Sequence, residues 1–253
     1  MNDPQIILKE IKRFSEEILG SNLVGLYVHG SLAFGCFTWQ NSDIDYLAVV
    51  ERPLTQEEKT AYIAAVLELN KKAPPKGIEM SVVLAEHCRN FVHPTPYELH
   101  FSNAHLQRAE ENTTAYCEAM HGLDPDLAAH FTVTRAVGKA FFGPEPAEMF
   151  APVPRETYLD SIRLDIENAA EDIFENPVYM ILNLCRVWAV LRDDAVLSKE
   201  QGGRWALPLL EPQLQPIVQA ALNAYTGKAA FPMETLQNEL PVFARKMLER
   251  IFP

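Results

Sequence analysis

Two aspartates at the start of an apolar stretch are the residues best suited by type and spacing to do chemistry. Asp43 and Asp45 open the run DIDYLAVV, residues 43–50, which has the composition of a buried β-strand. Residues two apart on a strand project from the same face. We therefore expect both carboxylates on one face, with Ile44 between them pointing into the core on the other.

A third carboxylate lies on the next predicted strand. Glu79 belongs to IEMSVVL, residues 78–84, whose apolar residues Ile78 and Met80 face away from it. If the two strands are neighbours in one sheet, Glu79 joins Asp43 and Asp45 in a single cluster. Carboxylates brought together repel one another and need a cation to offset the repulsion. Hard oxygen ligands favour Mg²⁺, which also binds the phosphates of ATP.

Such a cluster indicates phosphoryl-type transfer. A pair of Mg²⁺ ions would neutralise a triphosphate and hold the attacking and leaving oxygens in line. This chemistry needs little beyond positioning and charge stabilisation. Glu79, beside the metal, is suited to accept the proton of the attacking hydroxyl as a general base.

A Gly-Ser turn precedes the aspartates. Gly30 and Ser31 follow the short apolar strand 23–28 and begin a predicted helix. Gly30 lets the chain turn tightly, and Ser31 offers a hydroxyl and a backbone N–H, an arrangement that favours a phosphate. The Asp-x-Asp pattern alone is common, but here eleven residues separate it from Gly-Ser and it stands at the head of an apolar strand, which is far more specific.

The elements around this pattern predict a mixed α/β first half. Apolar residues recur at helical spacing over residues 4–19, and Gly20 ends that helix. Thr55 and Glu58 have the spacing of a capping box for a second helix, which runs to about Leu69.

The second half is predicted to be helical. Strand signals nearly vanish after the Pro-rich stretch 143–155, and the segment 178–192 is apolar almost all round, like a buried helix. Ser198 and Gln201 cap another helix, and 212–225 and 233–251 suggest two more. We predict an α/β N-terminal domain with a short mixed sheet, residues 1–150, followed by an all-α helical bundle domain, residues 151–253.

The composition limits the classes of molecule that the chain is expected to bind. The net charge of −12 argues against a nucleic-acid partner and suits a cationic small molecule. No apolar run approaches the roughly 20 residues of a membrane span, and the first residues lack the features of a signal peptide. The four cysteines form no C-x-x-C pair, so we expect reduced thiols. We expect a cytoplasmic monomer with no membrane partner.

These motifs resemble a known family. Residues 29–50 look like the signature of the nucleotidyltransferase superfamily typified by DNA polymerase beta. The runs PYELHFSNAHLQR, DPDLA, FGPEPAEMFAPVP, LNLCRVWAVL and SKEQGGRWALPLL resemble the aminoglycoside adenylyltransferases that act on streptomycin and spectinomycin. The resemblance covers roughly residues 15 to 225.

The resemblance implies a nucleotidyltransferase domain followed by a helical domain, with ATP and a hydroxylated acceptor bound between them. It also implies that Asp43, Asp45 and Glu79 hold Mg²⁺, that Glu79 is the catalytic base, and that Arg186 and Lys199 contact the triphosphate of ATP. The implied function is transfer of AMP from ATP to a hydroxyl of a small, cationic acceptor.

The residues leave alternatives open for the two basic side chains. Arg186 lies in an otherwise apolar helix and needs an anion, which is either a carboxylate or a phosphate. Lys199 lies in the first turn of a helix, where a cation is misplaced unless an anion is near. A solvated surface lysine is the other interpretation.

The acceptor pocket departs from the streptomycin pattern. Ala104 or His105 stands where the streptomycin enzymes carry a tryptophan, and Glu175 is the nearest acid where they have an acidic stretch. We therefore expect a spectinomycin-like aminocyclitol to be preferred over streptomycin. Residues 156–175 hold seven acids and one base, either a wall for a cationic substrate or a solvated helix face. We expect Trp188 and Trp205 in the core.

Two alternative functions are considered. The chain could be a catalytically silent nucleotide sensor, or an adenylyltransferase that acts on a protein or another metabolite. The intact set of Asp43, Asp45, Glu79 and Ser31 argues against a silent sensor, which has no need of clustered carboxylates.

Overall fold

The computed structural model describes residues 2–252 and contains two compact units, which divide after Pro154. The boundary predicted from the sequence lies after residue 150, and the division into functional domains remains a proposal. The fold class is confirmed: the first unit contains a mixed sheet with helices, and the second is helical. No helix within residues 2–252 combines the length and the apolar character that crossing a bilayer requires.

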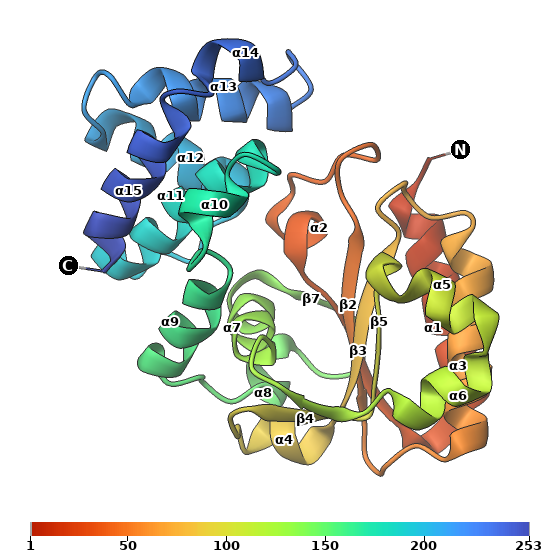
Figure 1. Ribbon diagram of the computed structural model, residues 1–253. Helices are drawn as coiled ribbons and strands as arrows, with labels where there is room; N and C mark the ends of the chain where they lie inside the picture. Colours follow the sequence, from red (N-terminus) through yellow and green to blue (C-terminus); the bar gives the residue numbers. More distant parts are fainter. Residues whose placement is uncertain (1, 253) are drawn as a thin grey trace. The chain divides into compact units, whose positions relative to one another are not determined.

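A five-stranded sheet forms the centre of the first unit, in the order β5-β3-β2-β1-β7 (Figure 1). The strands are β1 (Leu23–Val28), β2 (Ile44–Val50), β3 (Ile78–Leu84), β5 (Leu99–Phe101) and β7 (Lys139–Phe142). β2 and β3 are parallel, while every other neighbouring pair in this sheet is antiparallel. The predicted strands 23–28 and 78–84 are confirmed. The strand predicted over residues 43–50 begins one residue later, at Ile44.

A small ribbon of β4 (Thr95–Tyr97) and β6 (Gly122–Asp124) completes the β-structure of the described residues. None of β4, β5, β6 and β7 was predicted from the sequence. Each is only three or four residues long, which is too short for an alternating pattern to stand out from the surrounding chain.

Four helices cover one face of the large sheet (Figure 1): α1 (Pro4–Leu19), α3 (Gln56–Asn70), α5 (Leu106–Glu111) and α6 (Thr113–Ala119). The predicted ends of α1 hold, because Asp3 caps its first turn and Gly20 follows its last. The predicted Thr55–Glu58 capping box opens α3. Ile11 and Tyr62 from these helices pack against Tyr46 and Val82 of the sheet.

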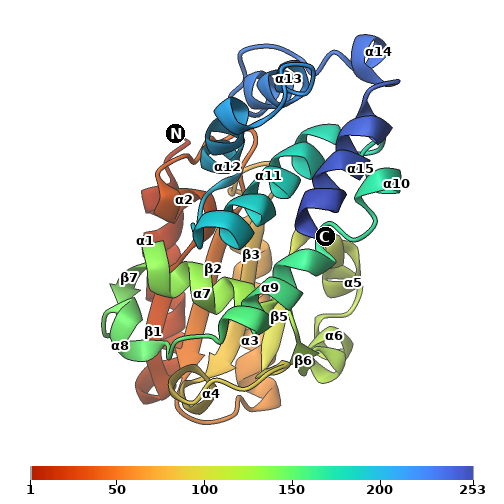
Figure 2. The ribbon, with the colours of Figure 1, turned by 90° about the vertical axis from the view of Figure 1, so that its left-hand side faces the viewer.

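The opposite face carries the candidate site. It is covered by α4 (Ala85–Arg89), α7 (Leu127–Val137) and α8 (Pro146–Met149), and α7 crosses in front of the strands in Figure 2. Buried apolar residues hold this layer together, among them Leu47 and Val83 from the sheet and Phe131 from α7. Because side chains alternate along a strand, Asp45 and Glu79 project to this same face.

The second unit contains seven α-helices among its described residues: α9 (Arg155–Leu164), α10 (Ala169–Asp172), α11 (Pro177–Asp193), α12 (Lys199–Ala206), α13 (Gln215–Tyr225), α14 (Met233–Leu236) and α15 (Leu240–Ile251). The central helix, α11, packs against α12, α13 and α15. The predicted Ser198–Gln201 capping box opens α12.

The prediction of one helix over 233–251 is wrong. The chain leaves helical geometry between α14 and α15, and Pro241 lies in the first turn of α15. Proline lacks a backbone N–H and clashes with the preceding turn, so it begins a helix far more readily than it continues one.

Candidate active site

Strand pairing brings the three predicted carboxylates together. In the parallel pair, Asp45 lies directly opposite Glu79, and Asp43 immediately precedes β2 on the same face. One oxygen from each of the three side chains lies within 4.8 Å of the others, and all three residues are partly buried. Within residues 2–252, no other group of three or more His, Cys, Asp or Glu residues converges in this way. The donor set is entirely carboxylate oxygen, which suits a hard divalent cation such as Mg²⁺.

Gly30 begins the short helix α2 (Gly30–Phe34) directly against this cluster. Its φ of +56° is one that residues with a side chain rarely adopt. A Cβ atom at this position would also overlap the carboxylate of Asp45. The preceding backbone N–H, that of His29, donates to the carbonyl oxygen of Asp45 at 3.1 Å. Glycine is therefore required both by the backbone angle and by the close approach of Asp45.

Ser31, the next residue, has a buried hydroxyl without a hydrogen-bond partner among the described residues. A buried hydroxyl left in this state costs free energy, and native proteins rarely leave one unexplained. A phosphate oxygen would supply the missing partner. The position of this hydroxyl next to Gly30 and the carboxylates thus fits the nucleotide-binding role predicted for Ser31.

A His–Asp pair on α7 borders the cluster, and the sequence analysis did not predict it. His130 Nε2 lies 3.2 Å from Asp126 Oδ2, one helical turn away. Burial lowers the pKa of His130, but the charges of Asp126, Glu79 and Asp124 and the hydrogen bond to Asp126 outweigh it and raise this pKa to about 10. The i, i+4 spacing was readable, although nothing in the sequence placed α7 over Glu79.

His29 is a buried residue at the junction of β1 and α2, and its ring centroid lies 4.9 Å from that of His130. Burial lowers the pKa of His29 well below its usual value, and the charge of His130 lowers it further. His29 lies between the end of β1 and the start of α2, where its ring packs against that of His130.

His100 extends the polar surface across β5. It lies opposite Ser81 in the antiparallel β3–β5 pair, and its Nδ1 is 3.0 Å from Ser81 Oγ. Burial lowers the pKa of His100 to about 4, assisted by the charges of His105 and His130. Since Ser81 follows Glu79 by two residues on β3, both lie on the same face of the sheet.

Arg186 and Lys199 lie in the second unit. Arg186, on α11, has its Nη2 3.7 Å from Asp165 Oδ2, with both side chains partly exposed. The structure therefore offers the carboxylate that was one of the two partners expected for Arg186. Lys199, at the start of α12, places its Nζ 4.8 Å from the centre of the Tyr179 ring. It is only partly exposed, unlike a freely solvated surface lysine. Binding of phosphate by either residue remains a prediction.

The expectation of core positions for Trp188 and Trp205 is wrong. Both are partly exposed, and their rings meet edge to face at 5.0 Å. Arg192 lies over both rings, and Trp205 Nε1 donates to Asp193 at 2.9 Å. An indole combines a large apolar surface with an N–H that needs a partner, so the border of the core suits it better than the interior.

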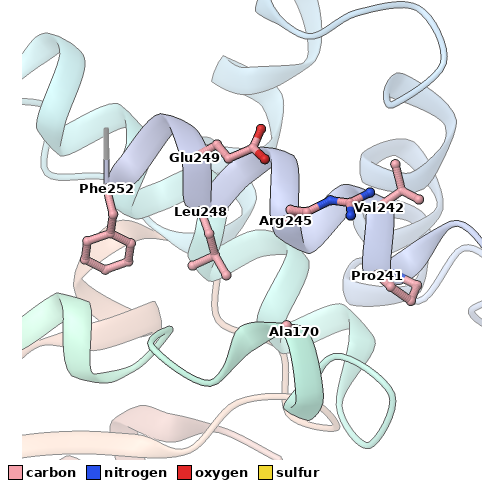
Figure 3. A pocket seen from close by; sticks show the side chains of 7 residues that line it. All are labelled: Ala170, Pro241, Val242, Arg245, Leu248, Glu249 and Phe252. Carbon is pink, nitrogen blue, oxygen red and sulfur yellow. The ribbon is translucent and has the colours of Figure 1, made fainter.

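A shallow apolar groove lies along α15 of the second unit, with Ala170 of α10 on its other side (Figure 3). Its polar side chains are Arg245 and Glu249. None of the predicted site residues lines it, so the candidate site remains the carboxylate cluster of the first unit.

The chain is similar to known proteins along most of its length. Residues 148–250 match the family described as "Aminoglycoside adenylyltransferase, C-terminal domain". Spectinomycin 9-adenylyltransferase of Staphylococcus aureus is 25% identical over 240 residues, which cover 93% of this chain and 90% of the relative. Aminoglycoside (3'')(9) adenylyltransferase of Escherichia coli is 26% identical over 242 residues, with coverage of 93% and 90%.

A solved structure has the same fold. The crystal structure of spectinomycin adenyltransferase AAD(9) from Enterococcus faecialis, with ATP and spectinomycin, aligns with a TM-score of 0.81 at 19% sequence identity. The alignment covers 98% of this chain and 99% of that one. Both units thus have counterparts, in the same order, in that enzyme.

Proposed function

We infer that this chain, which belongs to the aminoglycoside adenylyltransferase family, transfers AMP from ATP to a hydroxyl group of a small cationic acceptor. The observation that carries this inference is the pairing of Asp45 with Glu79 across β2 and β3. With Asp43, these residues place three carboxylates within 4.8 Å of one another, next to the Gly30–Ser31 turn.

Asp43, Asp45 and Glu79 would hold Mg²⁺, and the fit rests on their convergence and on their hard oxygen donors. When bound, a pair of Mg²⁺ ions offsets the charge of the triphosphate and favours in-line displacement. Without a cation, the three like charges repel one another. The cluster therefore favours the binding of a cation.

The Gly30–Ser31 turn is proposed to hold the nucleotide. The absence of a side chain at Gly30 allows the backbone to approach Asp45 closely, and a phosphate there would receive a hydrogen bond from the buried Ser31 hydroxyl. We propose Arg186 and Lys199 as further contacts to the triphosphate, because each carries a positive charge on a side chain that is only partly exposed.

Glu79 is proposed as the general base. The oxygen of the acceptor hydroxyl forms a bond to the α-phosphorus of ATP, and the bond from that phosphorus to the pyrophosphate oxygen breaks. The pyrophosphate leaves with the electron pair of that bond. The proton of the acceptor hydroxyl passes to a carboxylate oxygen of Glu79, which makes the attacking oxygen more nucleophilic.

We propose that the acceptor is a spectinomycin-like aminocyclitol rather than streptomycin. Relatives of this chain are named for spectinomycin. Ala104 or His105 stands where the streptomycin enzymes have an aromatic side chain, and Glu175 is the nearest acid where they have an acidic stretch. A large guanidinium-bearing acceptor needs several carboxylate partners, and a pocket without them rejects it through unpaired charge.

A cytoplasmic, monomeric enzyme without a nucleic-acid or membrane partner is part of the same proposal. The net charge of −12 supports the lack of a nucleic-acid partner. Light scattering coupled to size-exclusion chromatography tests the monomer.

The deciding experiment measures AMP transfer from labelled ATP to spectinomycin, streptomycin and other aminoglycosides, with and without Mg²⁺. We expect Mg²⁺-dependent labelling of spectinomycin and little labelling of streptomycin, with the Asp45→Asn variant as the inactive control. Labelling of streptomycin alone would contradict the acceptor preference but keep the chemistry. Absence of transfer to every acceptor would contradict the proposed function.

A further inference from the structure

Several polar side chains gather near His130, where α7 meets the junction of β1 and α2. Leu127 and Phe131 of α7 pack against the sheet in a buried apolar cluster. Beside them, Asp126 and His130 form a polar edge of the helix, and His29 and His100 lie near His130. A polar layer of this kind costs stability unless it is fully paired or binds something.

His130 is fixed from both sides. Its Nε2 donates to Asp126 at 3.2 Å, and its side chain is only 19% exposed. Its ring rests on His29, whose backbone N–H donates to the carbonyl oxygen of Asp45 at 3.1 Å. A chain of contacts therefore runs from the backbone of Asp45 through His29 and His130 to Asp126. The charge of Glu79 also contributes to the raised pKa of His130.

Asp126 differs from its neighbours in this layer because its side chain is 47% exposed. An ionised carboxylate has room for about four hydrogen bonds, and a charge-assisted bond to an ammonium group is among the strongest of them. His130 holds this carboxylate at a fixed orientation on the border of the cluster. Asp126 is thus a solvent-accessible anion held by His130, whose ring meets His29 at the junction of β1 and α2.

We propose that Asp126 binds an ammonium group of the acceptor and so presents a nearby hydroxyl to Glu79, while His130 acts as the positioning residue for Asp126. This inference rests on the proposed function and specifies its substrate class: a compact polyol with an ammonium group a few bonds from the hydroxyl that is modified. It assigns acceptor recognition to the first unit, independent of the acidic stretch at residues 156–175.

A purely structural role is the competing explanation. Asp126 lies at the N-cap position of α7, where a negative charge is favourable, and an i, i+4 pair with His130 supports the helix. Both explanations predict a loss of stability on mutation. Only acceptor binding predicts that Asp126 decides between a cationic and a neutral form of the same acceptor.

The test compares AMP transfer to spectinomycin and to its N-acetylated, uncharged form, at saturating ATP and Mg²⁺. Asp126→Asn should raise the KM for spectinomycin by at least about tenfold, the effect of losing a charged hydrogen bond. The KM for ATP should not change. The preference of the wild type for the cationic form, measured as a ratio of kcat/KM values, should fall towards one.

His130 has its own conservative variant. His130→Gln retains a donor for Asp126 and should keep most of the preference for the cationic acceptor, whereas His130→Leu should lose it as Asp126→Asn does. Glu110→Gln, which removes one negative charge from the exposed surface of α5, is the matched control and should leave the ratio unchanged. Melting temperatures of all variants separate loss of fold from loss of recognition.

The experiment distinguishes a failure of the inference about Asp126 from a failure of the proposed function. If the wild type transfers AMP to spectinomycin and Asp126→Asn keeps the full preference for the cationic form, the inference is overturned and the proposed function stands. If the wild type transfers AMP to no aminocyclitol, both fail.

Discussion

Asp45 and Glu79 occupy the same register position on adjacent parallel strands, so the fold itself holds two like charges side by side. Asp43 adds a third, within 4.8 Å. This arrangement is unfavourable without a cation. The three carboxylates therefore lower the stability of the ion-free protein and raise its affinity for a divalent ion. Mutations that remove one carboxylate should change these two quantities in opposite directions.

The first prediction is that Asp45→Asn abolishes AMP transfer but leaves the fold intact. Removing one of three neighbouring negative charges weakens Mg²⁺ binding and relieves repulsion in the ion-free state. The melting temperature without Mg²⁺ should hold or rise, and the increase that Mg²⁺ and ATP give the wild type should shrink. Differential scanning calorimetry with and without Mg²⁺ checks both effects. Wild-type turnover in this variant would refute the metal site.

The second prediction tests whether Glu79 is the general base or only a ligand of the metal ion. Glu79→Gln keeps the size of the side chain but removes the carboxylate that accepts the proton. We expect the chemical step to slow by about 100-fold or more, while nucleotide still binds, if more weakly. Single-turnover kinetics at saturating ATP measures this. Recovery of the normal rate at high ATP would show that Glu79 is a ligand and not the base.

The sequence predicted this cluster because strand alternation fixes the face of each side chain. Asp43, Asp45 and Glu79 each had a determined face before the strands were paired, and only one condition, that β2 and β3 be neighbours, remained open. The His130–Asp126 pair could not be found in the same way. Its position depends on α7 packing across the sheet, a long-range contact that no local pattern in DPDLAAH specifies.

Other features were predicted wrongly because they also depend on contacts between distant parts of the chain. The strands after residue 94 are short, and their pairing, not their composition, makes them strands. Trp188 and Trp205 have apolar helical spacing, but cation–π contacts with Arg192 hold them at the border of the core. The break before α15 was readable at Pro241, and helical periodicity across 233–251 concealed it.

The third prediction concerns Gly30. Gly30→Ala forces a side chain into a positive-φ position and against the Asp45 carboxylate, so it should both destabilise the first unit, by about 1–3 kcal/mol, and reduce activity. Gly35→Ala is the matched control, because Gly35 also has a positive φ, +74°, but open space where a Cβ would lie. It should lower the melting temperature and leave Mg²⁺-dependent activity near wild type. Equal activity losses in the two variants would contradict the close approach to Asp45.

The fourth prediction is a pH dependence of stability through His100. Burial lowers its folded-state pKa to about 4, whereas the unfolded chain titrates near 6.5. Between these values the unfolded state binds more protons, so stability falls as the pH decreases. This contribution is complete above about pH 6.5 and is lost below about pH 4. Urea unfolding at a series of pH values should show a shallower decline for His100→Gln than for the wild type. Parallel curves would contradict the burial of a neutral imidazole.

The last prediction decides between the two partners of Arg186. A partly exposed ion pair with Asp165 at 3.7 Å contributes at most about 1 kcal/mol. If this pair is the whole role of Arg186, then Arg186→Ala and Asp165→Asn should lower stability by similar, non-additive amounts, and ATP affinity should not change. We expect the other result: Arg186→Ala weakens ATP binding strongly, Asp165→Asn has little effect, and Lys199→Ala behaves like Arg186→Ala. Calorimetric titration with a non-hydrolysable ATP analogue and Mg²⁺ measures the affinities. Unchanged affinity in both lysine and arginine variants would remove the second unit from triphosphate binding and leave the nucleotide to Gly30, Ser31 and the three carboxylates.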